Sequence, residues 1–263
     1  MNFGIRNKIA LVTAASKGLG KAAAQALARE GASLVICSRT EKDILATADE
    51  IRREWNVPVE ALAADVSDGN AVNAVVEFAK RKYGTVHILV NNAGGPPAGD
   101  ILSLTDDAWQ QGNQLTLMSM VRFTRAVLPM MIQQHWGRIL TITSIAGKQP
   151  INELLLSSAI RPGIHGLTKV LSNEYAQYNI TINTICPGNI LTKRQEELGS
   201  VRAAKQKISM EQYFKDLSAN IPAGRLGRPE EIGDVIAFLA SEQAGYINGV
   251  NLLVDGGAAK GIH

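Results

Sequence analysis

Short apolar runs alternate with longer amphipathic stretches along the whole chain. Apolar runs of about four to eight residues predict buried strands, and apolar positions that recur at helical spacing predict helices. Strands are therefore expected at 8–13, 33–38, 59–63, 87–91, 138–144, 181–186 and 251–254. Helices are expected between them at 19–30, 41–54, 69–83, 106–135, roughly 159–178, and 230–240.

This alternation predicts an α/β fold in which helices cover both faces of a parallel sheet. Right-handed crossovers then give a doubly wound, Rossmann-type sheet of about seven parallel strands. The pattern has no break in composition, so residues 1–263 are expected to form a single dinucleotide-binding domain.

One segment, 192–220, departs from the rhythm because it is charged and poor in strand formers. It follows the Pro187-Gly188 turn, beyond the carboxyl end of a strand, where ligands bind in open α/β sheets. The segment is therefore a candidate substrate lid, and a solvated pair of surface helices is the alternative.

Composition limits the classes of protein that need to be considered. The chain is 46% hydrophobic and 19% charged with a formal net charge of +3, as expected for a globular protein with an ample core. The positive charge is scattered, so neither nucleic acid nor a membrane surface is an expected partner. The first residues do not resemble a signal peptide, and no apolar run is expected to approach the roughly 18 residues of a membrane span. A cytoplasmic protein is expected.

Cysteine and histidine residues give no sign of a disulfide or a metal site. Cys37 and Cys186 lie in apolar strands and are expected to be reduced core thiols. The four histidines lack metal-ligand spacing, so no metal site is expected.

The most informative segment follows the first strand and opens the first helix. Gly18 and Gly20 allow the backbone to turn tightly and to approach a pyrophosphate, which the unpaired amides of a helix N-terminus attract. A glycine motif alone is weak, but its position between a strand and a helix of an alternating series makes it specific. The residues expected at the cofactor are Thr13, Ala15, Ser16, Lys17, Gly18, Leu19 and Gly20.

The second strand indicates which dinucleotide binds. An NAD enzyme places an acid there, whereas this chain has Ser38 and Arg39. Arg39, helped by Lys17, can hold a 2′-phosphate, so NADP(H) is favoured over NAD(H); an Arg39 that only faces solvent is the alternative. Other residues expected at the cofactor, Asp65, Val66, Asn92, Ala93 and Gly94, follow the third and fourth strands.

Together these motifs resemble the short-chain dehydrogenase/reductase superfamily, most closely its reductases of 3-oxoacyl carrier-protein type. The resemblance covers essentially the whole chain, and also includes Gly137-Arg138 leading to Ser144, the segment from Gly224 to Glu231, and Val254-Asp255-Gly256-Gly257. Ala14 replaces the usual first glycine of the family, which looks mild because it adds only a methyl group. The resemblance implies a nicotinamide ring near Ser144, with Ile190 and Thr192 beside its carboxamide and the phosphates. Pro187 and Gly188 are also expected at the cofactor. The resemblance also implies a small carbonyl or alcohol substrate and a homotetramer.

The family uses a Tyr as proton donor, a Ser to hold the carbonyl oxygen, a Lys on the nicotinamide ribose and an Asn that supports a water relay. The alignment keeps only the Ser, as Ser144. It puts Thr116 at the Asn position, Ser157 at the Tyr position and Arg161 at the Lys position. The spacing from Ser144 to Ser157 is the usual one for the family, which argues against a misalignment.

These replacements change the expected chemistry. Arg161 can grip ribose hydroxyls and place positive charge near an alkoxide, but its pKa, ordinarily above about 12, prevents it from donating a proton. Losing the general acid should lower the reduction rate by about 10²–10⁴. Two routes remain open: a water held by Ser157, Ser144 and Arg161, or a substrate that carries its own acid or binds Arg161 through a carboxylate. Three nearby residues, Asn152, Glu153 and Ser158, are further candidates.

Pro162 follows Arg161 directly. Because proline breaks helix interiors, the helix is expected either to begin near residue 159 or to be kinked. The first hypothesis for function is an NADP(H)-dependent oxidoreductase of a carbonyl and alcohol pair, in which Ser144 binds the oxyanion and the proton donor is non-standard. The alternatives are an NADP(H)-binding sensor or assembly partner with little turnover, and a non-redox reaction such as a dehydration.

Overall fold

Seven parallel strands form one sheet in the order β3-β2-β1-β4-β5-β6-β7. The computed structural model describes residues 2–152 and 154–261. The strands are β1 (Ile9–Val12), β2 (Ser33–Ser38), β3 (Val59–Ala63), β4 (Ile88–Asn91), β5 (Gly137–Ile142), β6 (Ile180–Pro187) and β7 (Asn251–Val254). The chain reverses its direction of winding between β1 and β4, where the sheet order jumps, and ligands bind at such switch points. The predicted doubly wound fold is confirmed.

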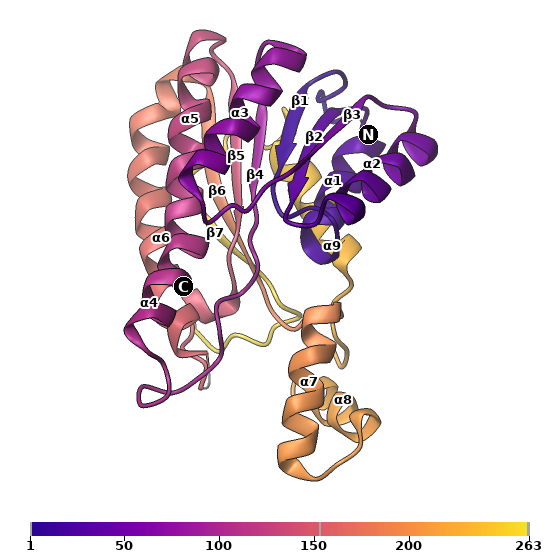
Figure 1. Ribbon diagram of the computed structural model, residues 1–263, viewed down its shortest axis with the longest axis vertical. Helices are drawn as coiled ribbons and strands as arrows, with labels where there is room; N and C mark the ends of the chain where they lie inside the picture. Colours follow the sequence, from indigo (N-terminus) through magenta and orange to yellow (C-terminus); the bar gives the residue numbers. More distant parts are fainter. Residues whose placement is uncertain (1, 153, 262–263) are drawn as a thin grey trace.

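Helices cover both faces of the sheet (Figure 1). One layer contains α1 (Gly18–Arg29), α2 (Glu41–Trp55) and α9 (Pro229–Ala240), whose apolar residues share a core cluster with β1 and β2. The other contains α3 (Gly69–Tyr83), α5 (Ser119–Gln133) and α6 (Leu155–Tyr175). Cys37 and Cys186 are both free and buried.

The helix expected at 106–135 is a composite of three pieces. It consists of α4 (Asp106–Asn113), a π-helical turn η1 (Gln114–Met118) and α5. By length and composition this run of 28 residues is apolar enough to cross a membrane, contrary to the expectation that no apolar run approaches that length. A single helix of this kind is weak support for a membrane span, and the buried residues Phe123, Val127 and Met131 pack it against the sheet core.

The helix that carries Ser157 and Arg161 begins before residue 159, so the predicted late start of this helix is wrong. α6 starts at Leu155 rather than near residue 159, and it runs through Pro162 without interruption to Tyr175. Pro162 is exposed on its outer face, whereas Leu156, Arg161 and Ile164 on the inner face are buried. Packing of the inner face therefore outweighs the local cost of a proline, whose ring removes one N–H donor from the helix.

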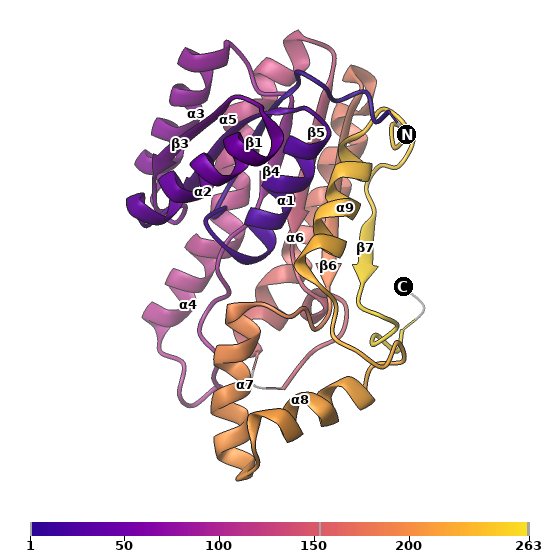
Figure 2. The same cartoon turned by 90° about the vertical axis from the view of Figure 1, so that its right-hand side faces the viewer.

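Two further helices, α7 (Lys193–Gln206) and α8 (Met210–Ala219), form the segment singled out as a candidate lid. They project from the carboxyl end of the sheet, away from both helical layers (Figures 1 and 2). Arg194 at the start of α7 donates from Nη2 to the carbonyl oxygen of Pro96, at 3.3 Å. The helix pair is thereby attached to the loop that follows β4.

Candidate active site

The β1–α1 loop is tied to the loop after β4 by side-chain hydrogen bonds. Thr13 Oγ1 donates to the carbonyl oxygen of Asn92 at 2.6 Å and accepts from its backbone N–H at 2.8 Å. Asn92 Nδ2 in turn donates to the carbonyl oxygen of Ala14 at 3.2 Å. These contacts hold two predicted cofactor segments side by side.

Gly20 is required by its surroundings in this loop. A Cβ at this position would lie 2.4 Å from the carbonyl oxygen of Ala14 and 2.5 Å from Asn92 Nδ2. Gly18 has a φ of +57°, in the region that favours glycine. The N-terminus of α1 receives no side-chain cap, so its first amides stay available.

The backbone at Ala14 shows that replacing the usual glycine is less mild than expected, because the residue adopts an unfavourable conformation. Its φ is +47°, in the left-handed region that residues with a Cβ rarely adopt. The Cβ is therefore crowded by the residue's own backbone, which costs about 1–2 kcal/mol.

Arg39 and Asp65 lie at neighbouring strand ends, since Ser38 pairs with Ala63 in the sheet. Burial raises the pKa of Asp65, but hydrogen bonds from the Ser67 amide and hydroxyl, together with the positive charge of Arg39, outweigh it and lower the pKa overall. Arg39 and Lys17 are both exposed. Two cations are therefore available to an anion at this edge of the sheet.

Ser144 starts the short 3₁₀ turn η2 (Ile145–Gly147), and this turn packs directly on α6. Its Oγ accepts a hydrogen bond from the Ala146 amide at 3.1 Å, which leaves the hydroxyl hydrogen free to donate elsewhere. A Cβ on Gly147 would lie 3.1 Å from Cβ of Arg161 and 2.5 Å from Cε1 of His165. Glycine at this position lets the Ser144 turn approach the helix that carries Arg161.

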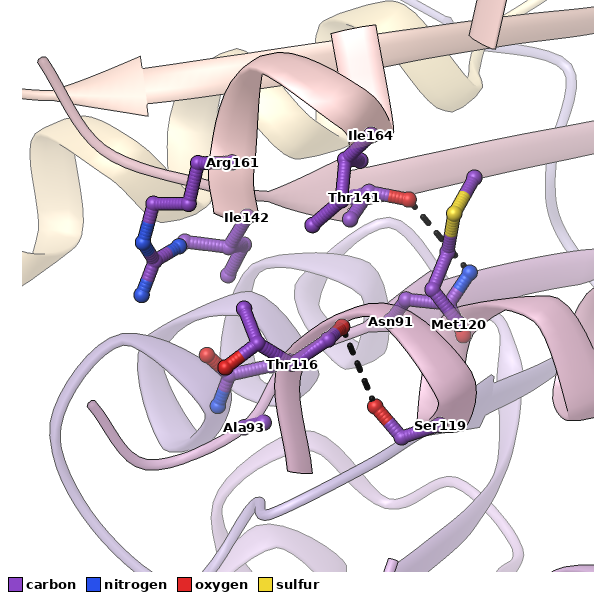
Figure 3. A pocket seen from close by; sticks show the side chains of 10 residues that line it. Asn91, Ala93, Thr116, Ser119, Met120, Thr141, Ile142, Arg161 and Ile164 are labelled. Carbon is purple, nitrogen blue, oxygen red and sulfur yellow. Dashed lines mark hydrogen bonds between the residues drawn. The ribbon is translucent and has the colours of Figure 1, made fainter. Parts of the chain in front are cut away.

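Arg161 is a buried cation in a polar cavity at the carboxyl ends of β4 and β5 (Figure 3). The residue is 7% exposed, and its Nε has no hydrogen-bond partner among the described residues. Burial lowers its pKa to about 10, so it remains protonated at neutral pH.

Thr116 and Asn91 line the same cavity. Thr116 lies in the π-helical turn η1, a feature that often marks functional sites. Thr116 Oγ1 and Asn91 Oδ1 are buried and also without a partner in the described part of the chain. Asn91 Nδ2 donates to Thr124 and Thr141 hydroxyls, both at 3.4 Å. The cavity has a volume of about 10 Å³, enough for roughly one water molecule.

Ser157 lies in the first turns of α6 and is buried. Ser158 Oγ accepts from the backbone N–H of Ile151 at 3.2 Å, which gives it a structural role at the start of the helix. Asn152 is exposed, and Glu153 lies outside the described residues.

The segment after β6 reaches the glycine loop. Pro187 ends β6, and the Gly188 amide donates to the carbonyl oxygen of Val254. Ile190 is buried and forms a bridge with Gly227, while Thr192 caps α7 by accepting from the Gln195 amide. A Cβ on Gly18 would lie 3.8 Å from Cγ2 of Thr192, so the start of α7 sits beside the start of α1.

A buried cluster next to Arg161 was not predicted from the sequence. Thr143 Oγ1 lies 3.2 Å from both His165 Nε2 and Cys186 Sγ. Burial, followed by the charges of Lys148 and Arg161, lowers the pKa of His165 to about 4. The i, i+4 spacing of Arg161 and His165 was the available signal, because it places both on one face of the helix.

Known proteins resemble this chain over nearly its full length. The family described as Enoyl-(Acyl carrier protein) reductase matches residues 13–259. The 3-oxoacyl acyl-carrier-protein reductase FabG of Escherichia coli (strain K12) is 35% identical over 257 residues, which cover 98% of each chain.

Solved structures agree with this likeness. L-sorbose reductase from Gluconobacter frateurii, in complex with NADPH and L-sorbose, superposes with a TM-score of 0.96 at 32% identity and covers 100% of both chains. A variant of the actinorhodin polyketide ketoreductase with NADPH superposes with a TM-score of 0.93 at 32% identity, covering 97% of this chain and 98% of that one. The chain therefore belongs to the short-chain dehydrogenase/reductase superfamily, in the family described as Enoyl-(Acyl carrier protein) reductase.

Proposed function

We propose that this protein is an NADP(H)-dependent oxidoreductase that interconverts a carbonyl and an alcohol. The observation that carries the proposal is the packing of the Ser144 turn on the helix of Arg161. This packing brings a hydroxyl donor and a buried cation to the carboxyl edge of the sheet. The similar L-sorbose reductase and actinorhodin ketoreductase structures contain NADPH, and the relative from Escherichia coli is a 3-oxoacyl reductase.

The residues present fit a dinucleotide. A side chain at Gly20 would fill the cradle between Ala14 and Asn92, and the first amides of α1 lack a side-chain cap. The residues that would hold the cofactor are Thr13, Ala15, Ser16, Lys17, Gly18, Leu19, Gly20, Ser38, Arg39, Asp65, Val66, Asn92, Ala93, Gly94, Arg161, Pro187, Gly188, Ile190 and Thr192. When bound, the nicotinamide supplies or accepts a hydride.

Arg39 and Lys17 support NADP(H) over NAD(H). Both are exposed cations. Arg39 follows β2, where an acid would bind the ribose of NAD, and Lys17 lies in the β1–α1 loop, whose Ala15 amide donates to the carbonyl oxygen of Cys37 in β2. A 2′-phosphate is held by charge-assisted hydrogen bonds from such groups, and a fork-shaped guanidinium suits it best.

In this proposal Ser157 and Arg161 stand where other members of the superfamily carry Tyr and Lys, and Thr116 stands at the position of the Asn. Ser144 donates its free hydroxyl hydrogen to the carbonyl oxygen of the substrate. Arg161 stabilises negative charge that develops on that oxygen, since preorganised charge in a buried site is effective. Arg161 stays protonated, so the proton for the alkoxide comes from a water molecule instead of a phenol.

The α7–α8 pair, residues 192–220, is proposed as a substrate lid. The contact of Arg194 with Pro96 and the position of Thr192 beside Gly18 support this role, because they join the pair to both cofactor loops. A cytoplasmic location and a homotetramer are proposed from the resemblance to the superfamily alone.

The alternative function is NADP(H) binding with little turnover, which the loss of a tyrosine donor favours. One experiment separates the two. The oxidation of NADPH is followed at 340 nm against ketones, 3-oxoacyl thioesters and oxo acids, and NADPH binding is measured on the same sample. We expect binding and turnover, with turnover at least 10-fold lower in Ser144→Ala and with NADPH affinity unchanged. Binding without turnover on every class would establish the alternative.

A further inference from the structure

Arg161 lacks a counter-charge. Its pKa is affected by burial and, to a lesser extent, by Cys186, and no described aspartate or glutamate contributes. It forms no ion pair with any residue that the structure describes. A second cation, Lys148, acts on the same buried surroundings, because the charges of Lys148 and Arg161 both lower the pKa of His165. The described lining of the cavity contains no aspartate or glutamate that could compensate the charge of Arg161.

A buried cation of this kind is costly to keep. Burying an unpaired charge costs several kcal/mol of folding free energy. A ligand that brings the opposite charge would compensate this cost. The hydroxyl groups of a ribose could accept hydrogen bonds from Arg161, but they are neutral and would leave its charge uncompensated. A guanidinium has five N–H donors, so it can bind such hydroxyls and an anion together.

The guanidinium of Arg161 lies at the edge of the small cavity, away from Asn91. Figure 3 shows the guanidinium at one end of the lining and Asn91 at the other, with Thr116 between them. The space of about 10 Å³ has room for roughly one water molecule. The guanidinium at the edge of the cavity can therefore bind a ligand that lies outside this small space.

We propose that Arg161 binds a carboxylate of the substrate, so that the protein acts on oxo acids and the matching hydroxy acids. A carboxylate matches the planar fork of the guanidinium and supplies the missing negative charge. This inference rests on the proposed carbonyl reduction for the reaction, but the anion site stands on the buried and unpartnered Arg161.

A first test compares an acid with its uncharged ester in the NADPH assay, with 2-oxopentanoate and methyl 2-oxopentanoate as the probes. We expect kcat/KM for the acid to exceed that for the ester by about 100-fold, because charge-assisted contacts in a buried site are lost with the ester. Arg161→Met should remove this preference, and Arg161→Lys should keep part of it. The matched control Arg125→Met, an exposed arginine on α5, should leave it unchanged.

A second test does not depend on turnover. Oxamate, an unreactive oxo-acid analogue, is titrated calorimetrically into the protein with NADP⁺, and the neutral diamide oxamide serves as the control. We expect oxamate to bind and oxamide not to bind. The affinity for oxamate should fall by about 100-fold in Arg161→Met. Arg161→Met should also raise the Tm of the ligand-free protein, because an unpaired buried charge is removed. A structural arginine would give the opposite shift.

The outcomes distinguish this inference from the proposed function. If the ester is reduced as well as the acid, the reductase stands and the carboxylate site is wrong. If neither is reduced but oxamate binds through Arg161, the anion site stands and the reductase is wrong. Failure of oxamate to bind to folded wild-type protein would also overturn the carboxylate site.

Discussion

Thr13 and Asn92 exchange two hydrogen bonds across 79 positions of sequence. The Thr13 hydroxyl donates to the Asn92 carbonyl at 2.6 Å and accepts from its amide at 2.8 Å. One side chain therefore satisfies both backbone groups of the residue that follows β4, and it fixes the glycine loop against that strand end. The proposed cofactor site depends on this link.

Thr13→Val tests the link, because it keeps the shape of the side chain and removes the hydroxyl. Both backbone groups of Asn92 lose their partner, so we expect the free energy of unfolding to fall by about 2–3 kcal/mol. Thr13→Ser keeps the hydroxyl and should cost about 1 kcal/mol, for the lost methyl group. Chemical denaturation of the three proteins measures the difference, and equal losses in both variants would contradict it.

Ala14→Gly should stabilise the protein. Ala14 has a φ of +47°, and glycine adopts this conformation without the penalty of a Cβ. We expect a gain of about 1 kcal/mol in the free energy of unfolding, after the greater freedom of glycine in the unfolded chain is subtracted. The neighbouring Ala15 is buried and has no positive φ, so Ala15→Gly should instead destabilise. A loss of stability in Ala14→Gly would refute the assignment of strain.

Arg39→Asp should move cofactor preference toward NAD(H). The new acid can accept hydrogen bonds from ribose hydroxyls and repels a 2′-phosphate. We expect the Kd for NADPH to rise by at least 10-fold, roughly the value of one charge-assisted contact. Removing the cation should also raise the pKa of Asp65, which Arg39 helps to lower. Unchanged NADPH affinity would show that Arg39 only faces solvent.

The free energy of unfolding should fall as the pH drops from about 6.5 to about 4. The upper limit is the ordinary pKa of histidine, and the lower limit is the pKa of His87 in the folded protein. His87 Nδ1 accepts a hydrogen bond from the Ile9 amide, and burial, followed by the charge of Lys8, lowers its pKa to about 4. The folded protein keeps His87 neutral in this range, whereas the unfolded chain takes up a proton. The lowered pKa thus contributes stability above pH 6.5, by up to about 3 kcal/mol, and this is lost toward pH 4.

Denaturation at pH 7.5 and pH 5 measures this effect. His87→Asn should reduce the drop in stability without removing it, because the pKa of His165 is lowered in the same direction. His135→Asn is the matched control: His135 is exposed with a positive φ that asparagine tolerates. An identical pH dependence in His87→Asn and wild type would contradict the assignment.

The fold could be predicted from the sequence because each strand is a short, mainly apolar run between turn residues. β1, β2 and β4 to β6 are buried along their whole length, and their Ile, Leu and Val residues mark them in the sequence. The helix through Pro162 was harder to predict. Proline usually breaks the interior of a helix, and only the packing of Leu156 and Ile164 on the inner face outweighs that effect here.

The site could be predicted only in part. The glycine loop, Arg39 and Ser144 follow from strand ends, whose positions the sheet topology dictates. The π-helical turn that carries Thr116 could not be predicted, since it arises from an extra residue per turn within a continuous helical pattern. The contact of Gly147 with Arg161 and His165 depends on how η2 packs on α6, which periodicity does not encode.

The most direct test of the proposed function is a single turnover with NADPH that carries deuterium at the nicotinamide C4. The protein, in excess over the labelled NADPH, is mixed with 2-oxopentanoate, the absorbance is followed at 340 nm, and the product is analysed by mass spectrometry. We predict loss of absorbance together with deuterium on the carbinol carbon of 2-hydroxypentanoate, and a slower loss in Ser144→Ala. NADPH that is bound but not consumed by this acid, or by any ketone tried in its place, would contradict carbonyl reduction by this protein.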